Sequence, residues 1–192
     1  MRKKVLLILI VFFIVYPSFG GIDLWFKSSL NTHSNGIYKS LYGTISYGWG
    51  IGIGTSPYEG ITIAGMYAKN NDKGFLSFTK EDLSLSISSI SVDIRVEPLT
   101  IFQNEYIFHI SPYISIEPSY NFYKENSIIN SSTGSKFVIV FGGGINVDIK
   151  GKNRFFIGVR YKNLKTFSRI LGQDINISGL CLEAGLKIII HN

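Results

Sequence analysis

Charged residues recur along the chain at positions that alternate with apolar ones, and this spacing is where chemistry is first sought. The set consists of Asp23, Lys27, Asp93, Arg95, Glu117, Asp148, Arg160, Glu183 and Lys187. Because successive side chains of a β-strand point to opposite faces, these groups share the face that carries Ser, Thr and Gly. Charges on an enclosed face need partners of opposite sign. We therefore expect a structural ionic network, with conduction or catalysis as the lesser alternative.

The histidines and Ser34 form no strong catalytic or metal-binding pattern. His33 and Ser34 weakly resemble the His and Ser of outer-membrane lipid A deacylases, but the family separates that pair by one residue and places it late in the chain. An envelope lipid-modifying enzyme is therefore a minor alternative. His109 and His191 are isolated, and no metal-ligand spacing is visible.

Cys181 and the run Gly142-Gly143-Gly144 also have ordinary structural explanations. A single cysteine excludes an internal disulfide, and we interpret it as a packing residue. The glycine run lacks the Lys-Ser/Thr pair and the helix that follow a phosphate-binding loop. We predict no catalytic residue, no cofactor and no metal.

The elements that carry the charged residues follow a period-two pattern typical of strands. It recurs eight times, in 22–30, 41–54, 61–69, 83–97, 110–123, 137–149, 154–162 and 178–190. In the fourth segment the phase slips at Ser88-Ser89, which predicts a β-bulge. Ten strands remain possible if 37–54 or 82–97 splits.

The first twenty residues have the layout of a secretory signal peptide. A basic head precedes the apolar run Val5–Tyr16, and Ser18-Phe19-Gly20 supplies small residues for cleavage. The run is too short for a membrane-spanning helix, which needs about 20 apolar residues. We expect a signal peptide over 1–20 and one domain over 21–192. Since the head holds three of the nineteen basic residues, the formal net charge of +6 does not indicate nucleic-acid binding.

The connections distinguish two arrangements that alternation alone leaves open. Long polar segments follow the first, third, fifth and seventh strands, including 70–82, 124–136 and 163–176, and shorter ones follow the even strands. This asymmetry is typical of outer-membrane barrels, with short periplasmic turns and long outer loops. Outward aromatics near the outer strand ends agree with it, namely Tyr67, Phe122, Phe137 and Tyr161. In a soluble lipocalin-like barrel the apolar face would instead point inward and bind an apolar ligand.

The closing seam and one crowded strand give two detailed expectations. If the last strand pairs with the first, a single antiparallel register could set Lys27 opposite Glu183 and Asp23 opposite Lys187. Gly142 and Gly144 would leave room for the long side chain of Arg160 on the next strand.

The second half resembles the outer-membrane β-barrel domain of the OmpA/OmpX type. The motifs are Ser111-Pro112-Tyr113-Ile114, Phe141-Gly142-Gly143-Gly144-Ile145, Phe155-Phe156-Ile157-Gly158-Val159-Arg160-Tyr161 and a closing strand through Leu186. The resemblance implies an all-β fold, an antiparallel up-and-down transmembrane β-barrel of eight strands, inserted into outer-membrane lipid by the barrel assembly machinery. We predict a non-enzymatic, porin-like structural or interaction protein of the cell envelope, with a packed polar lumen and surface loops whose ligand the sequence does not name.

Overall fold

The computed structural model describes residues 21–33, 36–76, 81–102, 110–127, 131–149, 153–168 and 173–190. The expected signal peptide lies outside the described residues and stays a prediction. Ser34, His109 and His191 lie outside them as well.

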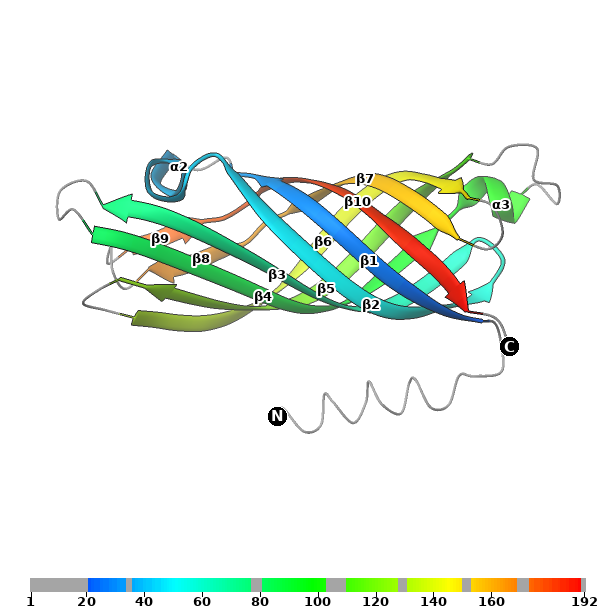
Figure 1. Ribbon diagram of the computed structural model, residues 1–192, viewed down its shortest axis with the longest axis horizontal. Coiled ribbons are helices and arrows are strands. Elements are labelled where there is room, and N and C mark those ends of the chain that lie inside the picture. The colour runs from blue at the N-terminus through cyan, green and yellow to red at the C-terminus, as the bar shows by residue number, and fades with distance from the viewer. Residues whose placement is uncertain are drawn as a thin grey trace, which may run out of the picture.

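Eight antiparallel strands close into a barrel in the order β1-β10-β7-β6-β5-β4-β3-β2 (Figure 1). The barrel strands are β1 (Ile22–Thr32), β2 (Ile45–Tyr58), β3 (Ile61–Leu76), β4 (Glu81–Val96), β5 (Ile110–Asn126), β6 (Ser131–Asp148), β7 (Arg154–Lys162) and β10 (Gly179–Ile190). Sequence neighbours pair throughout, and β1 pairs with β10 at the seam. The predicted up-and-down barrel of eight strands is confirmed.

Four small elements lie at the two ends of the barrel (Figure 1). One end, which we call the rim, carries α2 (Gly36–Tyr42) and the two-stranded sheet of β8 (Lys165–Ser168) and β9 (Gln173–Asn176). The other end, which we call the base, carries α3 (Pro98–Phe102), the start of β1 and the end of β10. None of the helices in the described part of the chain is long and apolar enough to cross a membrane.

Local sequence explains why α2 forms where a strand was expected. The strand predicted over 41–54 begins at Ile45, because α2 occupies the preceding residues. Gly43 ends the helix with a φ of 88°, and its N–H donates to the carbonyl of Lys39 at 3.1 Å. A left-handed glycine in this position is a common helix C-cap.

The bulge expected at Ser88-Ser89 is wrong. The register of β4 with β3 runs unbroken through Ser88 opposite Lys69 and Ser89 opposite Ala68. The irregularity in the sheet lies instead in β2, between Thr55 and Tyr58. The pattern slips in β4 because its inward residues change from polar to apolar while the backbone stays regular.

That change is visible in the burial of β4. Toward the base, the inward positions are Ser91, Asp93 and Arg95, all buried. Toward the rim, the same face carries Leu83, Leu85 and Ile87, also buried. β4 therefore does not split, and its two halves share one face with two kinds of side chain.

Long connections were expected at the rim and short ones at the base. In the structure, this difference lies mainly in strands that continue into the segments expected to be loops. Much of the polar segment 70–82 is strand, since β3 continues to Leu76 and β4 begins at Glu81. Likewise β5 continues to Asn126 and β6 begins at Ser131. Backbone pairing satisfies the polar main chain here as fully as in the apolar part of the sheet. The hairpins therefore extend toward the rim where sequence reading predicts long loops.

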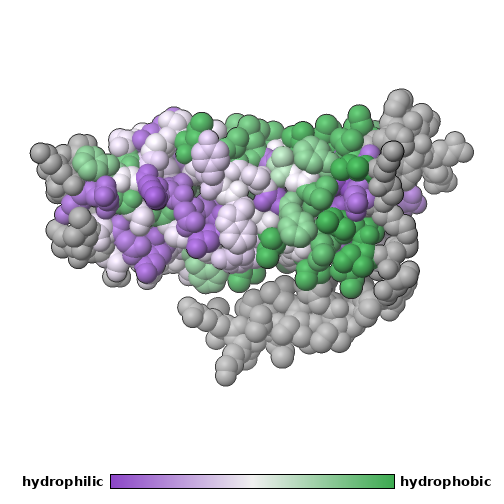
Figure 2. All heavy atoms as spheres, viewed as in Figure 1, coloured by the Kyte–Doolittle hydropathy of each residue, from purple (hydrophilic) through white to green (hydrophobic). Residues whose placement is uncertain are grey.

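The inward and outward faces follow the predicted alternation over the base half of the barrel. Ile139, Val159 and Leu182 point outward and are 44%, 44% and 49% exposed. Glu117 and Arg160 point inward and are 5% and 3% exposed. An apolar inward face, as in a lipocalin, is therefore wrong for this half. Figure 2 shows hydrophobic residues gathered over the base half and hydrophilic ones toward the rim.

Candidate functional site

The interior of the barrel holds a group of six charged side chains that we call the central cluster. Its members are Lys27, Asp93, Arg95, Glu117, Arg160 and Glu183. They come from β1, β4, β5, β7 and β10, so alternation on five strands brings them to one level. Three cations face three carboxylates, and the cluster is formally neutral.

Arg160 is the most connected member of the central cluster. Its guanidinium lies 2.5 Å from Asp93 Oδ2 and 2.8 Å from Glu183 Oε2, and it also contacts Glu117. Lys27 Nζ lies 3.5 Å from Glu117 and 3.8 Å from Glu183. Ser91 donates a further hydrogen bond to Glu117. Each carboxylate is thus met by at least two cations, which offsets the cost of burying its charge.

Arg95 adds an aromatic cage to the central cluster. It donates to Asp93 and Glu183 at 3.1 Å. Its guanidinium carbon also lies 4.3 Å from the ring centre of Trp25, 4.5 Å from Tyr113 and 4.2 Å from Phe156. Cation–π contacts of this kind stabilise a desolvated guanidinium. The cage fills the space beside the ion pairs with ring atoms.

A second ionic group lies nearer the base. Lys187 Nζ contacts Asp23 at 2.8 Å and the hydroxyl of Ser56 at 3.2 Å. Glu97 accepts hydrogen bonds from Ser111 at 2.6 Å and Arg154 at 2.9 Å. Asn146 donates to Glu97 at 3.0 Å, and Arg154 also pairs with Asp148 at 2.8 Å. We call this group the base network.

The structure divides the predicted charged residues between these two groups. Six of them form the central cluster, while Asp23, Asp148 and Lys187 lie in the base network. Sequence reading missed Glu97 and Arg154, because both stand at strand ends beside connections. The alternation of inward and outward positions could have identified them, because Glu97 continues the inward set of Asp93 and Arg95.

The predicted seam register is wrong by two residues. Lys27 faces Gly185 and Asp23 faces Ile189 across the β1–β10 pair. The expected ion pairs nevertheless form, at 3.8 Å for Lys27–Glu183 and 2.8 Å for Asp23–Lys187. Long side chains span the diagonal between staggered positions, so the contacts survive the shift.

Gly142 leaves room for Arg160, as expected. The two residues face each other across β6 and β7, and a Cβ on Gly142 would lie 2.6 Å from Arg160 Cγ. Gly144 has a different neighbour, since a Cβ there would lie 2.8 Å from the hydroxyl of Tyr113.

The rim half of the interior contains a cluster of buried apolar residues that we call the rim plug. It consists of Tyr38, Tyr42, Leu83, Leu85, Ile87, Val138, Val140, Leu164 and Ile177. The two tyrosines come from α2, which therefore packs over the rim. The Tyr38 hydroxyl donates to Asp72 at 2.5 Å and the Tyr42 hydroxyl to Glu125 at 2.7 Å. Burial, together with these carboxylates, raises the pKa of both phenols.

His33 lies under α2 with a serine other than the one expected. Its Nε2 is 3.0 Å from Ser46 Oγ, and its ring centre is 4.1 Å from that of Tyr38. Burial lowers the pKa of His33 to about 4, so the ring is neutral at pH 7. Both residues are buried, and Tyr38 of the rim plug packs on the His33 ring. The described residues contain no group of His, Cys, Asp or Glu that could hold a metal ion.

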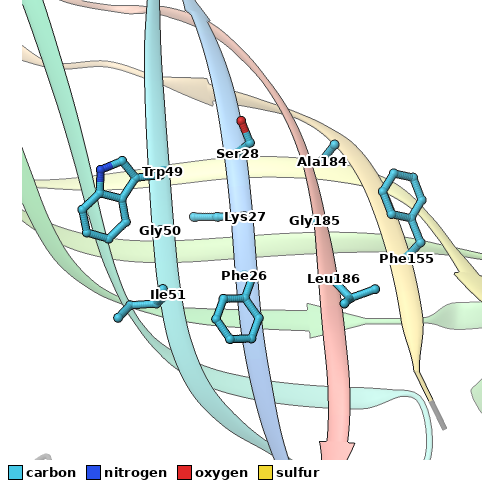
Figure 3. A pocket seen from close by; sticks show the side chains of 10 residues that line it. All are labelled: Phe26, Lys27, Ser28, Trp49, Gly50, Ile51, Phe155, Ala184, Gly185 and Leu186. Carbon is cyan, nitrogen blue, oxygen red and sulfur yellow. The ribbon is translucent and has the colours of Figure 1, made fainter.

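The outer wall carries a shallow apolar groove of about 570 Å³ beside the seam (Figure 3). Ser28 and Ala184 face each other there, and their small side chains form the bottom of the groove. Larger side chains surround them, namely Phe26, Trp49, Ile51, Phe155 and Leu186. The groove lies on the outward side of β1, β2, β7 and β10, and the stem of Lys27 also lines it.

The fold is that of a small antiparallel barrel, and the solved structures that share it include bacterial outer-membrane proteins. Neisserial surface protein A is similar with a TM-score of 0.68 and 13% identity, over 88% of this chain and 97% of that one. OprG from Pseudomonas aeruginosa gives 0.67 and 10%, over 91% and 97%. The N-terminal β-barrel domain of OprF from the same organism gives 0.54 and 8%, over 88% and 97%.

These similarities confirm the resemblance inferred from sequence at the level of the fold. No family model and no curated protein matches the sequence.

Proposed function

We propose that this chain is a non-enzymatic outer-membrane barrel with a packed interior, and that its rim contacts molecules outside the cell. Residues 1–20 export it, and the barrel assembly machinery inserts it into outer-membrane lipid. One observation carries the proposal. On β4 the outward face is apolar at Ile90, Val92 and Ile94, where the inward face is polar, and both faces invert toward the rim.

The inversion supports a change of solvent along the barrel. Outward positions toward the rim are Ser84, Ser86 and Ser88, opposite an inward face of Leu83, Leu85 and Ile87. A barrel in water buries apolar residues inside, and a barrel in lipid turns them outward. One strand with both patterns fits a barrel whose base half lies in lipid and whose rim stands in water.

The packed interior supports a role without conduction. The central cluster is formally neutral and deeply buried, and Arg95 stacks against three aromatic rings. The rim plug lies above it with its own side chains in contact. An eight-stranded barrel is only wide enough to be filled by side chains. These features support an interior without a continuous polar path for water or ions.

The polar groups of the rim favour a non-enzymatic role. His33 and Ser46 are buried, and the His33 ring packs against that of Tyr38. Asp72 accepts hydrogen bonds from the hydroxyls of Tyr38 and Ser46, whereas the acid of a catalytic triad binds the imidazole. These groups hold α2 on the barrel.

Reconstitution into vesicles tests the proposal. We expect the refolded chain to enter lipid vesicles, to resist extraction by salt and alkali, and to change its gel mobility on heating. In planar bilayers it should give no stepwise conductance. Recovery of folded protein from a detergent-free soluble fraction would contradict the membrane assignment. Stable channel openings would contradict the packed interior.

A further inference from the structure

The outward face of β3, β4 and β5 carries a cationic, hydroxyl-rich area that we call the headgroup patch. Its members are Lys69, Lys73, Ser84, Ser86, Ser88 and Lys124. Ser88 faces Lys69 on β3, and Ser86 faces Lys124 on β5. The serines thus form a central column with lysines on both sides.

The charge of the headgroup patch is not neutralised within the barrel. Lys73 and Lys124 are exposed and Lys69 is half-buried. In the described ranges, no ion pair joins these lysines to a carboxylate. Asp82 is the acidic residue on the outward face of β4, and it lies at the far end opposite Phe75. The patch is therefore a local surplus of positive charge.

The headgroup patch begins where the outward apolar surface ends. Lys69 follows Tyr67 by two residues on β3, and Lys124 follows Phe122 by two on β5. Two residues of strand cover about 7 Å. Trp49 on β2 faces Lys69, and its ring centre lies 5.9 Å from that of Tyr67. Aromatic side chains of this kind mark the boundary between hydrocarbon and headgroups.

We propose that the headgroup patch binds the phosphate of an anionic membrane lipid whose acyl chains lie against the apolar wall below. This inference rests on the proposed membrane location. Lysine supplies the charge, and the serine hydroxyls can donate hydrogen bonds to phosphate oxygens. A soluble polyanion would need only the cations, whereas the adjoining apolar wall suits a ligand that has chains as well.

Trp49 provides a native reporter for this lipid. It is 47% exposed and stands beside Lys69, while Trp25, the other tryptophan, is buried inside the barrel. Phosphatidic acid with brominated chains, mixed into phosphatidylcholine vesicles, quenches tryptophan that it contacts. Competition between brominated phosphatidic acid and brominated phosphatidylcholine gives the relative binding constant at Trp49. A Trp49→Phe variant identifies the signal that belongs to Trp49.

We expect phosphatidic acid to bind about five-fold more strongly than phosphatidylcholine, as one lysine near an anionic lipid gives. The triple variant K69Q/K73Q/K124Q should lower this ratio to about one. The matched triple variant K39Q/K136Q/K165Q removes three exposed lysines elsewhere and should keep it. In the unmodified protein, the preference should also fall at high salt.

Three results would overturn the inference: a ratio near one in the unmodified protein, an equal loss in both triple variants, or a preference indifferent to salt. Failure of the proposed function is seen separately. If brominated phosphatidylcholine alone does not quench Trp49, the wall is not in contact with lipid. If it quenches fully but phosphatidic acid has no advantage, the membrane location stands and the headgroup patch is not a lipid site.

Discussion

The central cluster and the rim plug both lie inside the barrel and meet on the inward face of β4, yet they fill the interior with opposite kinds of side chain. The central cluster buries six charges that neutralise one another, while the rim plug buries leucine, isoleucine, valine and tyrosine. β4 contributes Asp93 and Arg95 to the first and Leu85 to the second. Under the proposed membrane location, the difference teaches that what surrounds the barrel at each level determines which side chains its interior can use.

Where the outer wall meets hydrocarbon, the apolar side chains are already drawn outward and the interior is left with polar groups. Those groups must then pair, because an unpaired buried charge is costly. Where the outer wall meets water, burial inside is what removes apolar area from water. The level of the inversion on β4 thus marks the expected edge of the membrane.

Removing Arg160 should have the largest effect, because it leaves three carboxylates with two cations. We expect Arg160→Met to lower the free energy of unfolding by about 3–5 kcal/mol, measured by urea titration in detergent micelles. Lys165→Met, on the exposed rim, should change it by less than about 0.5 kcal/mol. Adding Glu117→Gln restores formal neutrality and should recover part of the loss. A double variant as unstable as the sum of its single variants would break the account of the central cluster.

The same substitution on one face of β4 should separate the lipid-facing and water-facing levels. Val92→Arg places a charge on the apolar wall and should cost about 2–4 kcal/mol of stability in vesicles, whereas Ser86→Arg should cost about 0–1 kcal/mol. Both residues point outward on the same strand. Equal costs for the two variants would contradict a membrane edge between them.

Tyr42 tests the polar contacts of the rim plug. Tyr42→Phe keeps the ring and removes the hydroxyl that donates to Glu125 at 2.7 Å. We expect a loss of about 1–2 kcal/mol, felt in the hydrogen exchange of α2. Tyr47→Phe, at an exposed position, is the matched control and should leave exchange unchanged. If α2 exchanges equally in both variants, the hydroxyl does not hold the helix.

His33 should make the rim plug sensitive to acid, with the smallest effect of the four. Burial lowers the pKa of His33 to about 4. Between about pH 6.5 and 4, the imidazole is therefore protonated in the unfolded rim and neutral in the folded rim. Stability of α2 is therefore full above about pH 6.5 and is lost as the pH falls. At pH 6 we expect about 1 kcal/mol less protection of the α2 amides, after correction for intrinsic exchange. His33→Asn should abolish this difference; an unchanged pH profile would remove His33 from the explanation.

Much of the barrel could be predicted from sequence because the strands alternate cleanly between apolar and polar residues in the base half. In β5, the outward set Ile114, Ile116 and Tyr120 and the inward set Ser115 and Glu117 fall as the period-two pattern predicts. The expectation failed at the rim, where apolar residues change faces. If apolar residues are assumed to stay on one face along the whole strand, the change of face at Ser88 is mistaken for a bulge.

The sequence predicts which charged residues point inward, but it does not predict which of them form ion pairs with one another. Parity identifies Asp93, Arg95 and Arg160 as inward, but it does not say which carboxylate each will meet. The seam register failed by two residues because Lys27 and Glu183 reach each other diagonally. Glu97 and Arg154 were not predicted, because they stand beside the connections at the base, where the alternating pattern ends.

Closure of the seam supplies the last charge of the central cluster. Glu183 is the contribution of β10 to that cluster, and β10 is the last of the described strands. A sheet made of β1 to β7 alone would hold Lys27, Arg95 and Arg160 against Asp93 and Glu117, with one cation in excess. Arrival of β10 removes that excess and buries the cluster in a single event. We therefore expect an unclosed sheet to be rejected by hydrocarbon, so that electrostatic completion acts as a proofreading step for assembly.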